Sequence, residues 1–186
     1  MEELLQLDQE AFLYLNNLGN TSWDGFWLFI TNKFASIPLY AVLLFLLFRK
    51  LGWKATLVVM VLVALMITCT DQLANVFKHG FERPRPCRED FIAYGRYIAE
   101  RCGRYGFFSA HAASSTALAV FLGLILKPYF RFAFILLTIW ALVVSYSRIY
   151  VGVHYLGDVL VGMFFGTLIG LGYFILFQYI KKKKQL

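Results

Sequence analysis

Apolar residues run through the chain in long blocks, separated by short polar stretches in which Lys and Arg gather. A helix needs about 20 apolar residues to cross a bilayer, and somewhat fewer where flanking side chains reach the interface. Five blocks predict membrane-spanning helices: residues 36–48, 55–77, 108–126, 129–145 and 159–180. The first block is the shortest, and an alternative is that it continues an apolar stretch that begins near Phe26 and is interrupted at Asn32 and Lys33.

Residues 3–16 have a different pattern, in which apolar side chains fall near one helical stripe with acids between them (Leu4, Leu7, Phe12 and Leu15). Such a pattern is typical of a helix that lies in the membrane interface. The predicted fold class is all-α: a polytopic membrane helix bundle of about five transmembrane helices plus an N-terminal interfacial helix. No repeat or Pro/Gly linker divides the chain, so residues 1–186 are expected to form a single integral membrane domain.

Composition supports this interpretation. Of the 186 residues, 60% are hydrophobic and 16% are charged, whereas soluble domains carry about 25% charge. The mean hydropathy is +0.63. An ordinary soluble enzyme, a disordered chain and a disulfide-dense secreted miniprotein are therefore excluded. The acidic start, Met1-Glu2-Glu3, lacks the basic region of a signal peptide, so no cleaved segment is expected.

The net charge of +7 comes from cations that lie between the apolar blocks, a placement typical of membrane topology and not of nucleic-acid binding. Basic groups at residues 49–54, 127–131 and 181–184 fall in alternate connections. The positive-inside rule places them and the C-terminus in the cytoplasm, and the N-terminus outside. The opposing loop, residues 79–105, holds six arginines against four acids and breaks the rule. Binding of an anion at the outer face explains this exception.

Polar side chains form three clusters that this topology brings to the outer face. They are Lys78 with Arg85; Ser109, Ala110 and His111; and Arg148, His154 and Asp158. Residues 154 and 158 are one helical turn apart, so the carboxylate can accept one ring N–H and leave the other nitrogen as a nucleophile.

Three cations, two histidines and a helix N-terminus suit phosphoryl transfer, in which charge on the phosphoryl oxygens must be stabilised. Arg85 and Arg148 can each bind two oxygens, while Lys78 supplies a point charge. Ser109 and the backbone N–H of Ala110 add donors. One histidine attacks and the other protonates the leaving group. No metal or cofactor is expected, and a zinc site built from the histidines is opposed by the adjacent cations.

The spacing Lys78-(six residues)-Arg85-Pro86, Phe108-Ser109-Ala110-His111 and Ser147-Arg148-(five residues)-His154-(three residues)-Asp158 resembles the three-part signature of the type 2 phosphatidic acid phosphatase superfamily. The resemblance implies a metal-independent helical-bundle phosphatase. It implies that His154 forms a phosphohistidine, Asp158 orients it and His111 is the general acid. The implied phosphate-binding residues are Lys78, Arg85, Ser109, Ala110 and Arg148. Phe108 and Ala110 replace the usual Pro and Gly. Because alanine cannot adopt a conformation restricted to glycine, the direction in which the Ala110 N–H points stays open.

The predicted function is an integral membrane phosphatase that hydrolyses a lipid phosphate or diphosphate. The candidate substrates are undecaprenyl diphosphate, phosphatidylglycerol phosphate, phosphatidic acid and a lipid A phosphate, with the first slightly favoured for a bacterial host. The expected location is the bacterial inner membrane with the site on the periplasmic face. The alternatives are a lipid phosphotransferase that passes the phosphoryl group to another lipid, and a non-catalytic anion transporter or scaffold. The expected partners are the substrate and membrane lipid, without nucleic acid.

Several side chains carry further expectations. Arg83 is interpreted as a rim charge, Cys69 as core packing, His79 as solvated, and Asp71 or Asn75 as a support for Lys78. Cys87 and Cys102 share the outward loop, where an oxidising compartment allows a disulfide. Small residues recur every fourth position at Gly162, Gly166 and Gly170, a pattern that packs helices within a monomer or across a dimer, so the oligomeric state stays open.

Overall fold

The computed structural model describes residues 2–185, whose secondary structure is helical apart from one isolated bridge between Pro84 and Tyr105. The α-helices are α1 (Glu2–Asn17), α2 (Thr21–Thr31), α3 (Ile37–Phe81), α4 (Ala110–Leu126), α5 (Ala133–Tyr150) and α6 (Leu156–Lys184). Short 3-10 helices lie at η1 (Lys33–Ser36), η2 (Pro86–Arg88) and η3 (Asp90–Tyr94). The all-α prediction is confirmed.

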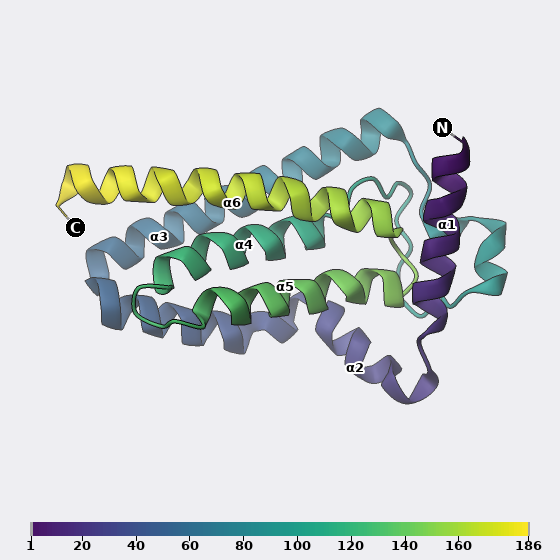
Figure 1. Cartoon of the computed structure of the whole chain (residues 1–186), viewed down its shortest axis with the longest axis horizontal. Coiled ribbons are helices and arrows are strands. Elements are labelled where there is room, and N and C mark those ends of the chain that lie inside the picture. The colour runs from purple at the N-terminus through teal and green to yellow at the C-terminus, as the bar shows by residue number, and fades with distance from the viewer. Residues whose placement is uncertain (1, 186) are drawn as a thin grey trace.

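Helix α3 consists of two limbs. Gly52 interrupts its helical geometry with φ +76° and ψ 172°, a conformation that glycine adopts readily because it has no Cβ, and the chain turns back there (Figure 1). The predicted spans 36–48 and 55–77 correspond to the two limbs. The stretch that begins near Phe26 does not continue into the first limb, because Asn32 leaves the helical region with ψ 130° and ends α2.

Within residues 2–185, three helical stretches are long and apolar enough to cross a membrane: Phe34–Phe81, Ala133–Tyr150 and Leu156–Lys184. Helix α4 is apolar but shorter, and nearly all of it is buried among its neighbours. It lies between α5 and α6 in the middle of the bundle (Figure 1). Its alanines let the flanking helices approach closely.

Three glycines of α6, at positions 162, 166 and 170, face α4. A Cβ on Gly162 would lie 2.6 Å from the carbonyl oxygen of Ser109, and one on Gly170 would lie 2.7 Å from that of Ala117. Gly166 contacts the carbonyl of Ala113 in the same way. Any larger side chain would push the two backbones apart, so the glycine spacing serves packing within the monomer.

Helix α1 crosses one end of the bundle (Figure 1). Phe12 is fully buried, with ring centroids 6.0 Å from Phe91 and 5.8 Å from Tyr155. Leu4 and Leu7 of the predicted stripe are exposed. The predicted N-terminal helix therefore exists, and its C-terminal half covers the end of the bundle.

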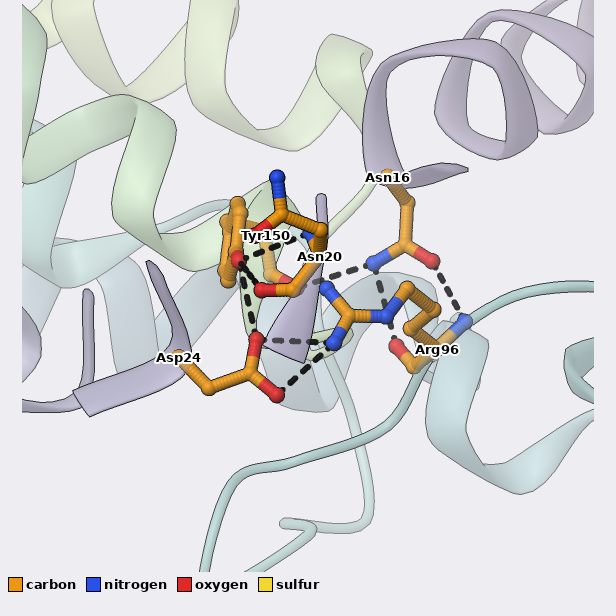
Figure 2. Close-up of polar contacts among 5 residues, drawn as sticks. All are labelled: Asn16, Asn20, Asp24, Arg96 and Tyr150. Atoms are coloured by element: carbon orange, nitrogen blue, oxygen red, sulfur yellow. Dashed lines mark hydrogen bonds and ion pairs between the residues drawn. The ribbon is translucent and has the colours of Figure 1, made fainter. Parts of the chain in front are cut away.

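A polar cluster fastens α1, α2 and the long loop 82–109 to the end of α5. Figure 2 shows its members, Asn16, Asn20, Asp24, Arg96 and Tyr150. The Asn16 amide donates to the carbonyls of Arg96 and Tyr150, both at 3.0 Å, and its oxygen accepts the Arg96 N–H. The Arg96 guanidinium contacts both carboxylate oxygens of Asp24 at 2.7 Å. These bonds hold the loop and α2 in place beside the site described below.

The long loop is also closed by a disulfide between Cys87 and Cys102, as its spacing allowed. Cys69, expected in the core, is instead exposed on α3. Its neighbour Thr70 is the residue of that turn that faces α4, where its hydroxyl lies 2.9 Å from that of Ser114. Helix rotation therefore turns Cys69 outward.

The three basic groups at residues 49–54, 127–131 and 181–184 lie at the end of the bundle opposite α1 and the long loop (Figure 1). Lys50 Nζ lies 5.6 Å from the ring centroid of Phe130, which joins the first two groups in space. The alternation of connections predicted from the sequence therefore matches the arrangement of the helices.

Candidate active site

A cavity of about 540 Å³ lies between α3, α4 and α5 at the α1 end of the bundle. Of the eight residues predicted for the site, six line this cavity: Lys78, Arg85, Ala110, His111, Arg148 and His154. The other two, Ser109 and Asp158, are fully buried. Residues separated by up to 80 positions in the sequence therefore meet at one end of the bundle.

His154 lies in the short connection between α5 and α6. Gly152, at φ +83°, lets the chain turn there, and Asp158 follows in the first turn of α6. The His154 Nδ1 lies 3.1 Å from Asp158 Oδ2, which also accepts the Tyr155 N–H at 3.2 Å. His154 is 2% exposed, so a ligand reaches its ring through the cavity.

The charge state of His154 follows from its surroundings. Burial lowers the pKa of His154 well below the ordinary value of 6.5, and the positive charges of Arg85, Arg148 and Lys78 lower the pKa further. The neutral ring is therefore the stable form at neutral pH. A neutral imidazole retains the lone pair that a nucleophile requires.

The cations reach the cavity from separate elements. Arg148, in the last turn of α5, donates from Nη1 to the Thr31 hydroxyl of α2, while its Nε is buried without a hydrogen-bond partner among residues 2–185. Arg85 Nε donates to the Tyr105 carbonyl at 2.9 Å. Lys78 comes from the last turn of α3. A buried donor without a partner beside two other cations is the chemistry of an anion site.

The start of α4 clarifies the two departures from the family signature. Phe108 is fully buried, with ring centroids 5.2 Å from Phe77 and 5.3 Å from Phe165. Ala110 begins α4 in a helical conformation, so glycine is not required there. Ser109 is the N-cap, and its hydroxyl accepts the Ala112 N–H at 3.4 Å. The Ser109 hydroxyl therefore lies behind the cavity wall, while Ala110 is part of that wall.

The interpretation of Arg83 as a rim charge is wrong. Its Nη1 lies 3.2 Å from Asp158 Oδ1 and its Nη2 lies 2.8 Å from Asp8 Oδ2. Its guanidinium carbon is 3.8 Å from the centroid of the Tyr155 ring. The Asp8 carboxylate also accepts the Gly157 N–H at 2.7 Å. Arg83 therefore joins α1 to the carboxylate that contacts His154.

Asp8 and Thr31 were not identified from the sequence as residues of the site. An acid inside the apolar stripe of residues 3–16 was a signal for the first, and the sequence offers no signal for the second. Asp71 and Asn75, expected to support Lys78, line the same cavity. His79 is exposed, as expected, and its Nδ1 lies 2.8 Å from the Asn75 carbonyl.

A sequence model of the PAP2 superfamily matches residues 53–182, which is more than half of the chain. The chain belongs to the PAP2 superfamily. Its sequence is 38% identical over 180 residues to the lipid A 4'-phosphatase of Bacteroides thetaiotaomicron, covering 94% of this chain and 79% of that protein. The lipid A 4'-phosphatase of Porphyromonas gingivalis is 37% identical over 175 residues, covering 91% and 72%.

A solved PAP2 structure has the same fold. The crystal structure of a transmembrane PAP2 type phosphatidylglycerolphosphate phosphatase from Bacillus subtilis matches 98% of this chain and 88% of that one. The TM-score is 0.73 and the sequence identity is 21%. The resemblance inferred from the three motifs, and the membrane helix bundle that it implied, are confirmed.

Proposed function

We propose that this PAP2 protein hydrolyses a phosphate monoester on a lipid of the lipid A type and releases the phosphate group. The reaction would pass through a phosphohistidine on His154. Membership of the family, together with lipid phosphatase relatives that match most of the chain, makes it a lipid phosphate phosphatase. One observation carries the proposed mechanism. His154, bound to Asp158 at 3.1 Å, shares one cavity with Lys78, Arg85 and Arg148.

In the proposed first step, Nε2 of His154 attacks phosphorus while Nδ1 stays bonded to Asp158. The bond between phosphorus and the lipid oxygen breaks, its electron pair leaves on that oxygen, and His111 donates the proton that forms the lipid alcohol. Water then attacks the phosphohistidine and gives a proton to His111. The P–N bond breaks, which releases inorganic phosphate and restores neutral His154.

The surrounding groups supply electrostatic stabilisation. Lys78, Arg85 and Arg148 neutralise the charge on the phosphoryl oxygens, and the Ala110 N–H adds a donor at the N-terminus of α4. The proposed reaction needs no metal ion or cofactor, because these groups supply the positive charge. Phosphate release is therefore expected to continue in EDTA.

The two relatives described above are lipid A 4'-phosphatases. Their similarity favours a lipid A phosphate over undecaprenyl diphosphate, the substrate slightly favoured from the sequence. The proposed location is the bacterial inner membrane. The basic end of the bundle would face the cytoplasm with the C-terminus, and the cavity would open to the periplasm.

The test is phosphate release by the purified protein in detergent from lipid A, undecaprenyl diphosphate, phosphatidylglycerol phosphate and phosphatidic acid. We expect release from lipid A, and none from any of these lipids with the His154→Ala variant. Labelled phosphate that appears on an acceptor lipid would identify a phosphotransferase. Full phosphate release by His154→Ala would exclude His154 as the nucleophile, and no release from any of these lipids by the wild-type protein would favour a transporter or scaffold.

A further inference from the structure

The cavity extends well beyond the phosphate-binding groups. On α3 its wall continues from Lys78 to Asn75, Gln72 and Asp71. Asp71 and Lys78 are seven positions apart, and at 1.5 Å per residue the wall runs about 10 Å along the helix. A phosphate needs only the end that holds His154. The rest of the cavity therefore accommodates the part of the substrate next to the phosphate.

This part of the wall is polar although it belongs to an apolar helix. Asp71, Gln72 and Asn75, here called the polar belt, are exposed and line the cavity. Ser114 of α4 lines the same cavity. Polar side chains on a membrane helix are costly against lipid, and they are retained where they face a polar ligand or a water-filled space.

Beyond the polar belt the cavity becomes apolar. Its lining continues with Ile67 on α3, Leu118 on α4 and Val144 on α5. The order of surfaces is thus a cationic end, a belt of hydrogen-bonding groups, and an apolar end. A matching ligand carries a phosphate, then hydroxyl or amide groups within about 10 Å of it, the length of the wall from Lys78 to Asp71, and then hydrocarbon.

We propose that the polar belt is a subsite for the sugar next to the phosphate, and that it selects phosphorylated glycolipids over polyprenyl phosphates. The inference rests on the proposed function, because the phosphate must occupy the end of the cavity at His154. Sugar hydroxyls donate to the Asp71 carboxylate and to the amide oxygens of Gln72 and Asn75, and their oxygens accept from the amide nitrogens. A polyprenyl chain places hydrocarbon directly after the phosphate and would leave these groups unpaired.

The test compares kcat/KM for two substrates, lipid A and farnesyl monophosphate, in the same detergent. The variants are Asp71→Leu, Gln72→Leu and Asn75→Leu, each of which replaces a polar side chain by an apolar one of similar size. Val76→Leu is the matched control, since Val76 is exposed on the same turn of α3 and does not line the cavity. Asp71→Asn and Gln72→Ala serve if a leucine variant does not purify as a folded protein.

We expect kcat/KM for lipid A to fall about tenfold in Gln72→Leu and Asn75→Leu, and by up to about a hundredfold in Asp71→Leu, whose charged acceptor forms stronger bonds. The preference for lipid A over farnesyl monophosphate should fall by similar factors. An equal fall for both substrates would assign the polar belt to support of Lys78 and overturn the subsite. Unchanged preference in all variants would overturn it too.

Failure of the sugar subsite and failure of the proposed function give different results. If the wild-type protein hydrolyses farnesyl monophosphate but not lipid A, the subsite is wrong while the phosphatase chemistry stands. If the wild-type protein releases phosphate from no lipid, the proposed function itself is wrong.

Discussion

Replacing Arg83 by Gln tests how His154, the proposed nucleophile, is held in position. The two oxygens of Asp158 have different partners: Oδ2 faces His154 and the Tyr155 N–H, and Oδ1 faces Arg83. Arg83 thereby fixes the rotation of the carboxylate and, through it, the orientation of the imidazole. Because Arg83 does not line the cavity, it is a positioning residue and not a phosphate ligand.

The magnitude follows from burial. Removing one partner of a fully buried ion pair costs about 3–5 kcal/mol. The Asp158 side chain is 0% exposed but that of Arg83 is 17% exposed, so solvent screens part of the interaction and we expect about 2 kcal/mol. If the loss of this interaction raises the activation free energy by the same amount, kcat falls about thirtyfold. KM should change little, because Lys78, Arg85 and Arg148 are untouched.

The assay is phosphate release from lipid A by Arg83→Gln, Asp8→Asn and the double variant, with kcat and KM measured separately. Asp8 lies on the far side of Arg83 at 2.8 Å, so we expect a smaller loss for Asp8→Asn and a double variant no worse than Arg83→Gln. Arg101→Gln, an exposed arginine of the same loop, is the control. A kcat for Arg83→Gln equal to that of the control, or an effect on KM alone, would refute this role.

Three further predictions concern His154, the helix contact and the loop. The pKa of His154 is lowered, so its neutral form persists below pH 6.5, and kcat/KM should fall only as the pH drops through the lowered pKa. Arg85→Gln removes a positive charge that lowers this pKa, so the acidic fall in kcat/KM should move to higher pH. Gly166→Val should lower the thermal stability in detergent far more than Gly172→Val, because Gly166 contacts the α4 backbone and Gly172 faces open space. Cys102→Ser should lower the free energy of unfolding by about 3 kcal/mol, since the disulfide closes a loop of 15 residues; equal stability with and without reductant would contradict this.

Much of the fold follows from local sequence pattern. The long apolar blocks identify the helices because a membrane span must be apolar over its whole length. The boundary between α2 and α3 follows in part: Asn32 and Lys33 interrupt the apolar stretch, but the sequence leaves open whether the helix stops there, which the backbone at Asn32 decides. Cys69 was misplaced for a related reason: on a helix that is apolar all round, composition does not indicate which face packs inward.

In the site, too, some contacts follow from local sequence and others do not. His154 and Asp158 are four residues apart, so local helix geometry was enough to pair them. The roles of Arg83 and Arg85 depend on the path of the long loop, which the Pro84–Tyr105 bridge and the disulfide determine. The hydrogen bond from Gly157 to Asp8 joins residues that are 149 positions apart in the sequence. A local sequence pattern does not predict a partner at that separation.

Detection of the covalent intermediate tests the mechanism most directly. The protein is mixed with lipid A labelled with ³²P at its phosphate groups, quenched within one turnover and digested for peptide mapping. We predict an acid-labile label on the peptide that contains His154, present in the wild type and absent from His154→Ala. Phosphate release at the wild-type rate from His154→Ala, or label on another residue, would contradict the assignment of His154 as the nucleophile.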